Sequence, residues 1–217
     1  MKRKTHDILF SLGGLALAGL LLIAGFVLTS NATFASNYVT DQLSQQNIVF
    51  KTTDTLTAEE KQAACLTTYA GQKLTNGKQA ECYANEFIGL HLRSIAGGKT
   101  YADLGEPQTQ LKAQIAQAQK DNAANVGSLQ KQLADVTSQR ETVFKGETLR
   151  GLLLTSYGFS EFGTKAAQAA AVAYLAAALL LLLAIAGFLH ALATPRNKAF
   201  AAPEPQPNAT AKRPVAV

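Results

Sequence analysis

The stretch Ile8–Leu28 reads ILFSLGGLALAGLLLIAGFVL, and a second apolar stretch, AAALLLLLAIAGFL, covers residues 176–189. At 1.5 Å per residue, a helix over the first stretch is about 31 Å long, which matches a hydrocarbon core of roughly 30 Å. Because hydrocarbon offers peptide groups no hydrogen-bond partner, chain segments that cross it must be helical. We therefore predict two transmembrane helices, at residues 8–30 and 166–193.

Charged residues make up only 16% of the 217 residues, whereas they approach a quarter of a typical soluble domain. The deficit is local, because no Asp, Glu, Lys or Arg occurs at residues 8–40 or 166–195. The remainder is long enough for one modest domain, at residues 31–165. This organisation excludes a large multidomain enzyme and predicts a membrane protein.

The first apolar segment also has features of a cleaved signal peptide. Its basic start, Lys2-Arg3-Lys4, suits either a signal peptide or an anchor, and Thr33-Phe34-Ala35 offers a small-residue cleavage site. However, signal-peptide cores run to roughly 7–15 residues, and this apolar core is about 21 residues long. We therefore expect an uncleaved anchor.

The distribution of charge predicts the orientation of the chain in the membrane. Residues 1–7 carry a net charge of +2 and residues 194–217 a net charge of +3, while the segment between them has thirteen basic and thirteen acidic residues. Basic flanks stay on the cytoplasmic side. We expect both termini in the cytoplasm of a plasma-membrane protein, residues 31–165 outside, and no binding of nucleic acid. The tail 194–217 is rich in Pro and Ala, which predicts disorder.

Composition and spacing predict that the outer domain is helical. Ala, Gln, Lys and Glu dominate residues 31–165, and apolar residues recur there at spacings of three and four. The first membrane helix should continue outward towards Gln46, since Phe34, Tyr38 and Gln42 follow at helical spacing. The predicted fold class is an all-α membrane protein, with two transmembrane helices flanking an extracytoplasmic helical domain.

Two helix starts stand out in residues 57–98. The sequence Thr57-Ala58-Glu59-Glu60 is a capping box and predicts a helix from Thr57 to about Lys73. Asn76, three residues before Gln79, predicts a second start, and Gly97-Gly98 predicts the end of that helix. The two helices would form an αα-hairpin that turns near residues 74–76.

The two cysteines lie symmetrically about this predicted turn. Cys65 and Cys82 have their midpoint between Lys73 and Leu74, so they would face each other across an antiparallel helix pair. The expected compartment is oxidising, which favours a disulfide, and closing that loop is worth about 3 kcal/mol on the chain-entropy model. The alternative is two unpaired thiols in the helix interface.

A second set of apolar residues predicts coiled-coil-like helices. The spacing alternates between three and four within each of two groups: Leu111, Ile115 and Ala118, then Val126, Leu129, Leu133 and Val136, with Val143 seven residues further on. Between the groups, Asp121–Gly127 breaks the phase, and its Asn, Asp and Gly favour a turn over a stutter. The apolar stretch Gly146–Phe162 should pack on the extended first helix or lie in the membrane interface.

These helices supply the candidate contact surface for a protein partner. We expect the partner to bind the seam and the stretch that follows it, at Leu111, Ile115, Leu129, Leu133, Val136, Leu149 and Arg150. Small residues four positions apart predict close helix packing in the membrane. They are Gly14 and Ala18 in the first span and Ala169, Ala173 and Ala177 in the second. They predict pairing of the two spans and, through any remaining face, a homo-oligomer.

The histidines and carboxylates of the sequence do not suggest a catalytic or metal site. His6 and His190 fall at the inner ends of the two spans, whereas His91 is outside, so no metal site can use all three. Glu59, Glu60 and the other helical carboxylates are expected at the surface. We predict no catalytic residue, no metal and no other cofactor.

Several motifs resemble those of a group of uncharacterised two-span membrane proteins from actinobacteria. The motifs are Thr5-His6-Asp7, Tyr69-Ala70-Gly71-Gln72 with Tyr83-Ala84, residues 97–102 (GGKTYA) and residues 146–154 (GETLRGLLL). The resemblance covers nearly all of residues 1–193 and implies the same two-span topology. Some members carry the label aromatic ring-opening dioxygenase, and this sequence departs from that chemistry because the membrane separates its histidines.

The sequence as a whole favours a non-catalytic membrane protein whose outer helical domain binds a protein or an envelope component, as a scaffold or accessory subunit. A second hypothesis is a ligand sensor that signals through a partner, because two spans flanking a helical bundle suit ligand-driven helix shifts. A metal-dependent ring-opening dioxygenase is the remote third.

Overall fold

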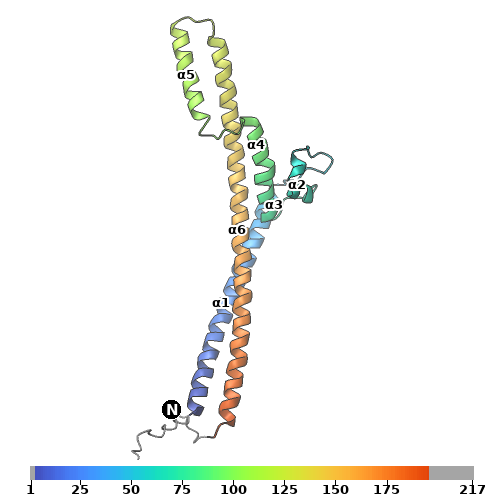
Figure 1. The fold of residues 1–217 in the computed structure, drawn as a ribbon, viewed down its shortest axis with the longest axis vertical. Helices are drawn as coiled ribbons and strands as arrows, with labels where there is room; N and C mark the ends of the chain where they lie inside the picture. The colour runs from blue at the N-terminus through green and yellow to red at the C-terminus, as the bar shows by residue number, and fades with distance from the viewer. Residues whose placement is uncertain (1–2, 196–217) are drawn as a thin grey trace, which may run out of the picture. The chain divides into compact units, whose positions relative to one another are not determined.

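The computed structural model describes residues 3–195 of the chain. In chain order the elements are α1 Arg3–Gln45, the 3₁₀ turn η1 Glu60–Gln62, α2 Ala64–Thr68, α3 Gly77–Cys82, the π-helix η2 Tyr83–Ile88, α4 Gly89–Ala96, α5 Gly105–Lys120 and α6 Val126–Ala193 (Figure 1). Two long apolar helices pack together, with short helices between them in the sequence. The described residues contain no strand, only an isolated antiparallel bridge between Val49 and Lys73. The predicted all-α class is confirmed.

The two long helices extend well beyond their apolar stretches. Helix α1 continues to Gln45, as its helical spacing predicted, and α6 runs without a break for 68 residues. No proline occurs between Pro107 and Pro195, so nothing in that interval removes a backbone donor from the helix. The predicted tail lies outside the described residues from position 196 on.

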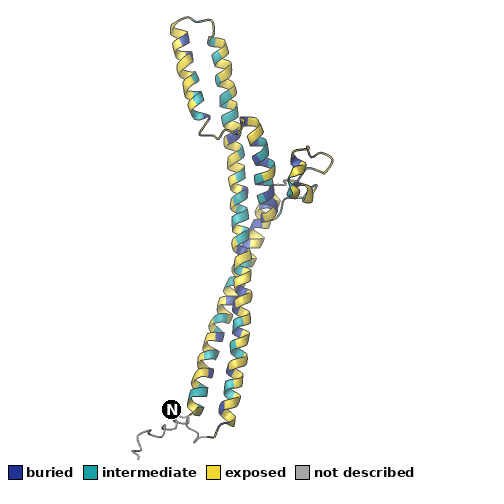
Figure 2. Ribbon diagram, viewed as in Figure 1, coloured by how far each residue is buried: buried dark blue, intermediate teal, exposed yellow. Residues whose placement is uncertain are grey.

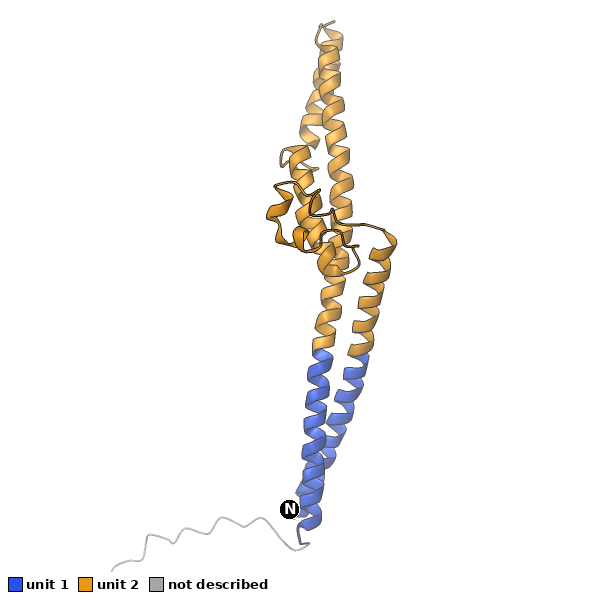
Figure 3. Cartoon of the chain, turned by 90° about the vertical axis from the view of Figure 1, so that its right-hand side faces the viewer, with its two compact units in different colours: residues 1–27, 169–217 blue, residues 28–168 orange. Residues whose placement is uncertain are grey.

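The chain divides into two compact units (Figure 3). Unit 1 comprises residues 1–27 and 169–217, and unit 2 comprises residues 28–168. Both long helices contribute to both units.

In unit 1, α1 and α6 pack as an antiparallel pair through small side chains. A Cβ added to Gly14 would lie 3.8 Å from the Cβ of Ala184, and one added to Gly25 would lie 2.6 Å from the ring of Tyr174. Four buried alanines of α6 recur every seven positions, at Ala170, Ala177, Ala184 and Ala191, and Ala173 is buried between the first two. A heptad repeat of small residues allows two helix backbones to approach closely along one seam. Most other side chains of this pair are exposed (Figure 2).

In unit 2, the consecutive helices α3, η2 and α4 run antiparallel to α6. Gly77 lies against Ser160, and Gly146 lies against the side chain of Leu92. The core of this unit contains buried residues from the end of α1, from the short helices, from the segments that connect them and from α6: Val39, Leu43, Phe50, Leu56, Leu66, Leu74, Ala80, Cys82, Ala84, Ile88, Leu92 and Leu153.

The predicted helix from Thr57 to Lys73 is wrong in extent. The capping box forms, because the Glu60 amide donates to Thr57 Oγ1 and the Thr57 amide donates to Glu60 Oε2, but it opens only the short turn η1. Ala63 is extended at φ −82° and ψ 103°, so α2 is a separate helix. Towards Lys73 the backbone instead pairs with residues 48–51, for example from the Leu74 amide to the Ile48 carbonyl at 2.9 Å.

The other helix signals of this region are confirmed. The Asn76 side chain accepts a hydrogen bond from the Gln79 amide and caps α3. The helix ends at Gly97, which has a left-handed φ of 60°, and the Gly98 amide donates to the Arg93 carbonyl. Residues 121–125 form a turn between α5 and α6, so the turn and not the stutter is correct.

Candidate functional site

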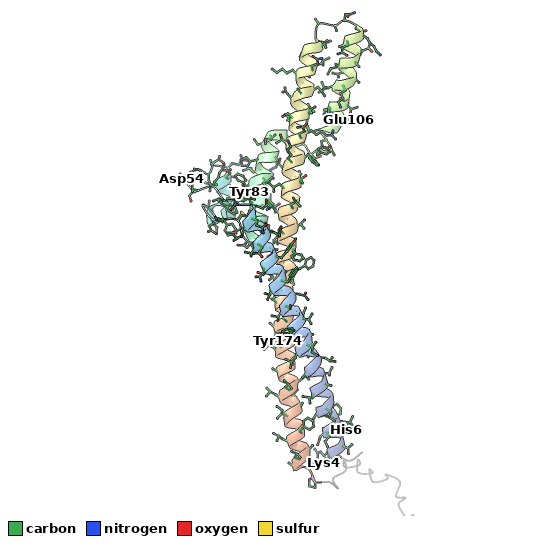
Figure 4. The ribbon with its side chains drawn as sticks, turned by 180° about the vertical axis from the view of Figure 1, so that it is seen from behind. Lys4, His6, Asp54, Tyr83, Glu106 and Tyr174 are labelled. Carbon is green, nitrogen blue, oxygen red and sulfur yellow. A yellow bond between two sulfur atoms is a disulfide. The ribbon has the colours of Figure 1, made fainter. Side chains whose placement is uncertain are left out.

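The predicted disulfide between Cys65 and Cys82 is present and joins α2 to the end of α3. The Cα atoms of the two residues are 6.0 Å apart, a usual separation for a disulfide. The bridge holds one side of the core of unit 2, where Phe50 packs against Tyr69 and Tyr83 with ring centroids 5.6 and 5.3 Å apart. Burial raises the pKa of Tyr83, whose side chain is labelled in Figure 4.

Glu60 is a buried carboxylate and not the surface charge that the sequence suggested. Its side chain is 1% exposed, and Lys51 Nζ lies 2.7 Å from Oε1. Burial alone would raise the pKa of Glu60, but the hydrogen bonds from Lys51 and from the Thr57 amide outweigh it and hold that pKa below its usual range. The capping box is the signal in the sequence that explains this, because it folds the side chain back onto the helix start. Glu60 is therefore an ionised structural anchor.

His91 approaches the same carboxylate from α4. Its Nε2 lies 3.5 Å from Glu60 Oε1, and its Nδ1 lies 2.7 Å from the Phe87 carbonyl oxygen. In unit 1, His190 Nδ1 lies 3.0 Å from Asp7 Oδ2. Nowhere in residues 3–195 do three or more His, Cys, Asp or Glu side chains gather in a way that could hold a metal ion. The described residues thus do not fit the iron site that a ring-opening dioxygenase needs.

The predicted helix-packing residues lie mostly on the seam of unit 1. Ala18, Ala173 and Ala177 are buried, and Gly14 faces Ala184. Ala169 is exposed, and the seam passes through Ala170 instead, since the buried positions of α6 follow the heptad that also includes Ala177. The prediction for Ala169 is therefore corrected by one position.

Most of the predicted partner surface packs within the chain. Helix α5 pairs with the start of α6, where Gln108 Nε2 donates to Thr137 Oγ1 and Arg140 donates to Gln108 Oε1. Ile115 is buried, and the other seam positions are half-buried: Leu111, Leu129, Leu133 and Val136. This seam stabilises the α5–α6 hairpin and offers little free surface to a partner.

Arg150 also faces inward. Its Nη2 donates to Asn85 Oδ1 at 3.2 Å, and its Nη1 lies 3.2 Å from Glu147 Oε2. It thereby fixes η2 against α6. Lys78 of α3 makes a second polar link to α6. Its pKa is raised by a hydrogen bond with Tyr157 and by the ion pair with Glu161 at 3.2 Å.

Leu149, in contrast, belongs to an open apolar groove in unit 2. The groove lies between α1 and α6 and has a volume of about 500 Å³. Its lining is Tyr38, Val39, Gln42, Leu43, Gln46 and Ile48 from the first side, and Leu149, Leu152, Leu153, Thr155, Ser156 and Phe159 from the second. We call this the unit 2 groove.

The floor and rim of the unit 2 groove differ in exposure. Val39, Leu43 and Leu153 form a buried floor, whereas Leu152 on the rim is 62% exposed. Along α6 the rim residues 149, 152, 156 and 159 recur at spacings of three and four, which is the spacing of one helix face. The contact surface predicted from the sequence included Leu149 but none of the α1 residues that line this groove. The helical spacing of residues 34, 38 and 42 was the only signal for the α1 side.

An aromatic cluster closes one end of this region. The ring of Phe159 lies edge-on to Tyr38, with centroids 5.7 Å apart, and to Phe34, with centroids 6.4 Å apart. Phe34 and Tyr38 also stack on each other. Such edge-to-face contacts fix the side chains of the groove rim in a defined arrangement.

Comparison with known proteins gives no match to a family model, a curated protein or a solved structure. The resemblance to two-span actinobacterial membrane proteins therefore stays a prediction that rests on the motifs quoted above.

Proposed function

We propose that this chain is a non-catalytic integral membrane protein of the plasma membrane, with two spans and both termini in the cytoplasm. Its extracytoplasmic helical domain would act as a scaffold or accessory subunit by binding a helix of another membrane or envelope protein. The unit 2 groove is the observation on which this proposal rests.

The two long helices support membrane insertion. Their most apolar windows have mean hydropathies of 2.3 and 2.6, and only 17% of each window is buried by the rest of the chain. A core helix of a water-soluble protein would be mostly buried, because exposed leucine side chains cost free energy in water. Lipid removes that cost, so the exposed faces of α1 and α6 are explained if both helices cross a bilayer.

The charge pattern supports the orientation. The two terminal segments, residues 1–7 and 194–217, carry the whole net charge of +5, and the segment between the two apolar stretches is neutral. In this orientation the Cys65–Cys82 bridge lies on the oxidising side of the membrane, where disulfides persist.

The ionisable side chains with clearly shifted pKa values suit structural roles. General acids and bases need pKa values close to neutral pH. Outside the proposed spans, the pKa values that the described surroundings clearly shift all move away from neutrality: those of Asp54, Glu60 and Asp103 fall, and those of Lys78 and Tyr83 rise. These groups keep a constant charge around neutral pH, as structural groups do.

The unit 2 groove has the features of a helix-binding site. It is apolar at its floor, and its α6 rim follows one helix face over residues 149–159, about 15 Å or nearly three turns. Gln42, Gln46 and Ser156 add hydrogen-bonding groups at the rim, which would fix the orientation of a bound helix. Peptide helices dock in grooves of this kind through residues spaced three and four apart.

A photo-crosslinking experiment in intact cells tests this proposal. A photoreactive amino acid at Leu152 stands on the groove rim, and one at Gly151, its neighbour in the sequence, faces open space outside the groove. We expect a cross-link of one defined mass from position 152 and none from position 151. Equal labelling at the two positions, or no cross-link at position 152 in a correctly inserted protein, would contradict the proposal. A cross-link that forms only after an external ligand is added would favour the sensor hypothesis instead.

A further inference from the structure

A second groove lies in unit 1, between α1 and α6, and has a volume of about 710 Å³. Its walls are mainly apolar, with Phe10, Leu17 and Leu183 among them, and its polar groups, His6, Asp7 and Ser11, all come from the start of α1. We call this the unit 1 groove. We infer that it binds one anionic phospholipid of the cytoplasmic leaflet, with an acyl chain in the apolar part and the headgroup at the start of α1. This inference rests on the membrane insertion proposed above.

The length of the groove fits one leaflet. Its α1 wall runs from His6 to Leu17, which at 1.5 Å per residue is about 17 Å. One leaflet accounts for half of a hydrocarbon core of roughly 30 Å. The groove therefore extends from the proposed cytoplasmic surface to about the middle of the bilayer, which is the reach of one acyl chain.

The shape of the groove follows from its glycines. A Cβ at Gly13 would meet no atom within 4 Å, so this wall borders open space. Gly14 and Gly187, in contrast, stand where the two helices approach, against Ala184 and Ser11 respectively. The contact at Gly14 and Gly187 forms the floor of the groove, and the missing side chain at Gly13 leaves its mouth open towards lipid.

The charges at the polar end favour an anionic headgroup. Arg3 and Lys4 begin α1, and Arg3 shares the helix face of His6 and Phe10 by its spacing of three and seven. Lys4 and His6 lie at the same end of α1 (Figure 4). The one carboxylate of the lining, Asp7, is in contact with His190, which limits its repulsion of an anion. Arg3 and Lys4 precede the first lining residue, His6, and basic residues at the cytoplasmic end of a membrane helix attract anionic headgroups.

The same charges disfavour another transmembrane helix as the occupant. A helix of a second copy would bring its own basic residues, at positions 2–4, to the same depth if it inserted in the same orientation. Like charges placed together in that way repel each other. A phosphate-bearing lipid brings the opposite charge and needs no further protein surface.

Fluorescence quenching by brominated lipids tests the inference, because the natural chain contains no tryptophan. The variant Phe10→Trp places a single reporter in the groove lining, and Leu12→Trp places one on the same helix outside the lining. Both parent side chains are largely exposed, at 73% and 52%. The full-length variants are reconstituted in phosphatidylcholine vesicles with equal small mole fractions of brominated phosphatidylglycerol or brominated phosphatidylcholine.

We expect brominated phosphatidylglycerol to quench the tryptophan at position 10 at least about fivefold more effectively than brominated phosphatidylcholine does. Fivefold corresponds to the attraction of one basic residue for an anionic membrane surface. The tryptophan at position 12 should show no such preference. Two further changes in the Phe10→Trp protein should remove the preference. Gly13→Leu fills the mouth of the groove, where a side chain meets no obstacle, and Arg3→Gln with Lys4→Gln removes the headgroup partners. Lys2 and the basic residues after position 195 remain to preserve the orientation.

The other outcomes separate the two proposals. Equal quenching by both brominated lipids at both positions would overturn the lipid site and leave membrane insertion intact. Protection of position 10 from both lipids, with position 12 quenched, would overturn it in favour of a protein helix in the groove. An absence of quenching at both positions would contradict membrane insertion itself.

Discussion

Loss of the Cys65–Cys82 bridge should destabilise one defined part of unit 2. The bridge closes a loop of 18 residues, counted from a sequence separation of 17. The chain-entropy relation then gives about 3 kcal/mol at 25 °C. The double variant Cys65→Ala, Cys82→Ala removes this restriction on the unfolded segment without introducing a polar group. We expect the free energy of local unfolding of residues 64–96 to fall by that amount.

Amide hydrogen exchange of the full-length protein, followed by peptide mass spectrometry, measures this loss. A fall of about 3 kcal/mol corresponds to exchange that is faster by roughly a hundredfold in residues 64–96. Peptides from α5 should exchange at the unchanged rate, because α5 packs on the start of α6 through contacts such as Gln108 with Thr137. Reduction of the natural protein provides a control without substitution. Unchanged exchange in residues 64–96, or the same acceleration in α5, would refute the reasoning.

Three further perturbations have defined outcomes. Gly146→Ala should destabilise unit 2 by about 1–3 kcal/mol, because the added Cβ would overlap the Leu92 side chain. Gly151→Ala, where the added Cβ meets no atom, should be neutral or slightly stabilising. Equal effects of the two substitutions on denaturant unfolding would count against the packing described here. The pKa of Glu60 is lowered in the folded protein, so its ionised form is the one that stabilises the fold. Its contribution to stability should be complete above about pH 4.5 and should be lost as the pH falls through the pKa of the folded state. Glu60→Gln should abolish this acid-dependent loss of stability, measured by hydrogen exchange. The pKa of Tyr83 is raised in the folded protein, so its neutral form is the one that stabilises the fold. Stability should therefore fall as the pH rises above 10, and Tyr83→Phe should remove that fall in the same measurement.

Local signals in the sequence predicted the features that depend on neighbouring residues. The cap at Asn76, the end at Gly97 and the turn at residues 121–125 each depend on backbone geometry within a few residues. The disulfide was predicted from its symmetry about residues 73 and 74. The bridge is present although the expected hairpin is not, because α2 is short but still lies beside α3.

Features that depend on distant contacts could not be read from the sequence. The helix predicted to reach Lys73 stops early because residues 71–74 pair with residues 48–51, a contact that local propensity does not encode. Glu60 is buried because Lys51 and His91 approach it from other segments. The exposure of Ala169 depends on the phase of α6 against α1, and a shift of one residue changes the face by about 100°.

The candidate site was predicted only in part for the same reason. An apolar seam such as residues 111–136 looks identical in sequence whether it packs inside the chain or binds a partner. Pairing of α5 with α6 uses it internally, whereas the unit 2 groove combines residues from α1 with residues more than a hundred positions away on α6. Only the tertiary structure shows which apolar face stays open.

Accessibility to a membrane-impermeant thiol reagent tests the central claim most directly. In the Cys65→Ala, Cys82→Ala background, single cysteines are introduced by Asn122→Cys in the turn between α5 and α6, and by Val217→Cys in the C-terminal tail. The proposed two-span topology, with both termini in the cytoplasm, predicts that the reagent labels position 122 on intact cells. It predicts labelling of position 217 only after the membrane is permeabilised. Labelling of position 217 on intact cells, with position 122 protected, would contradict the proposed two-span orientation.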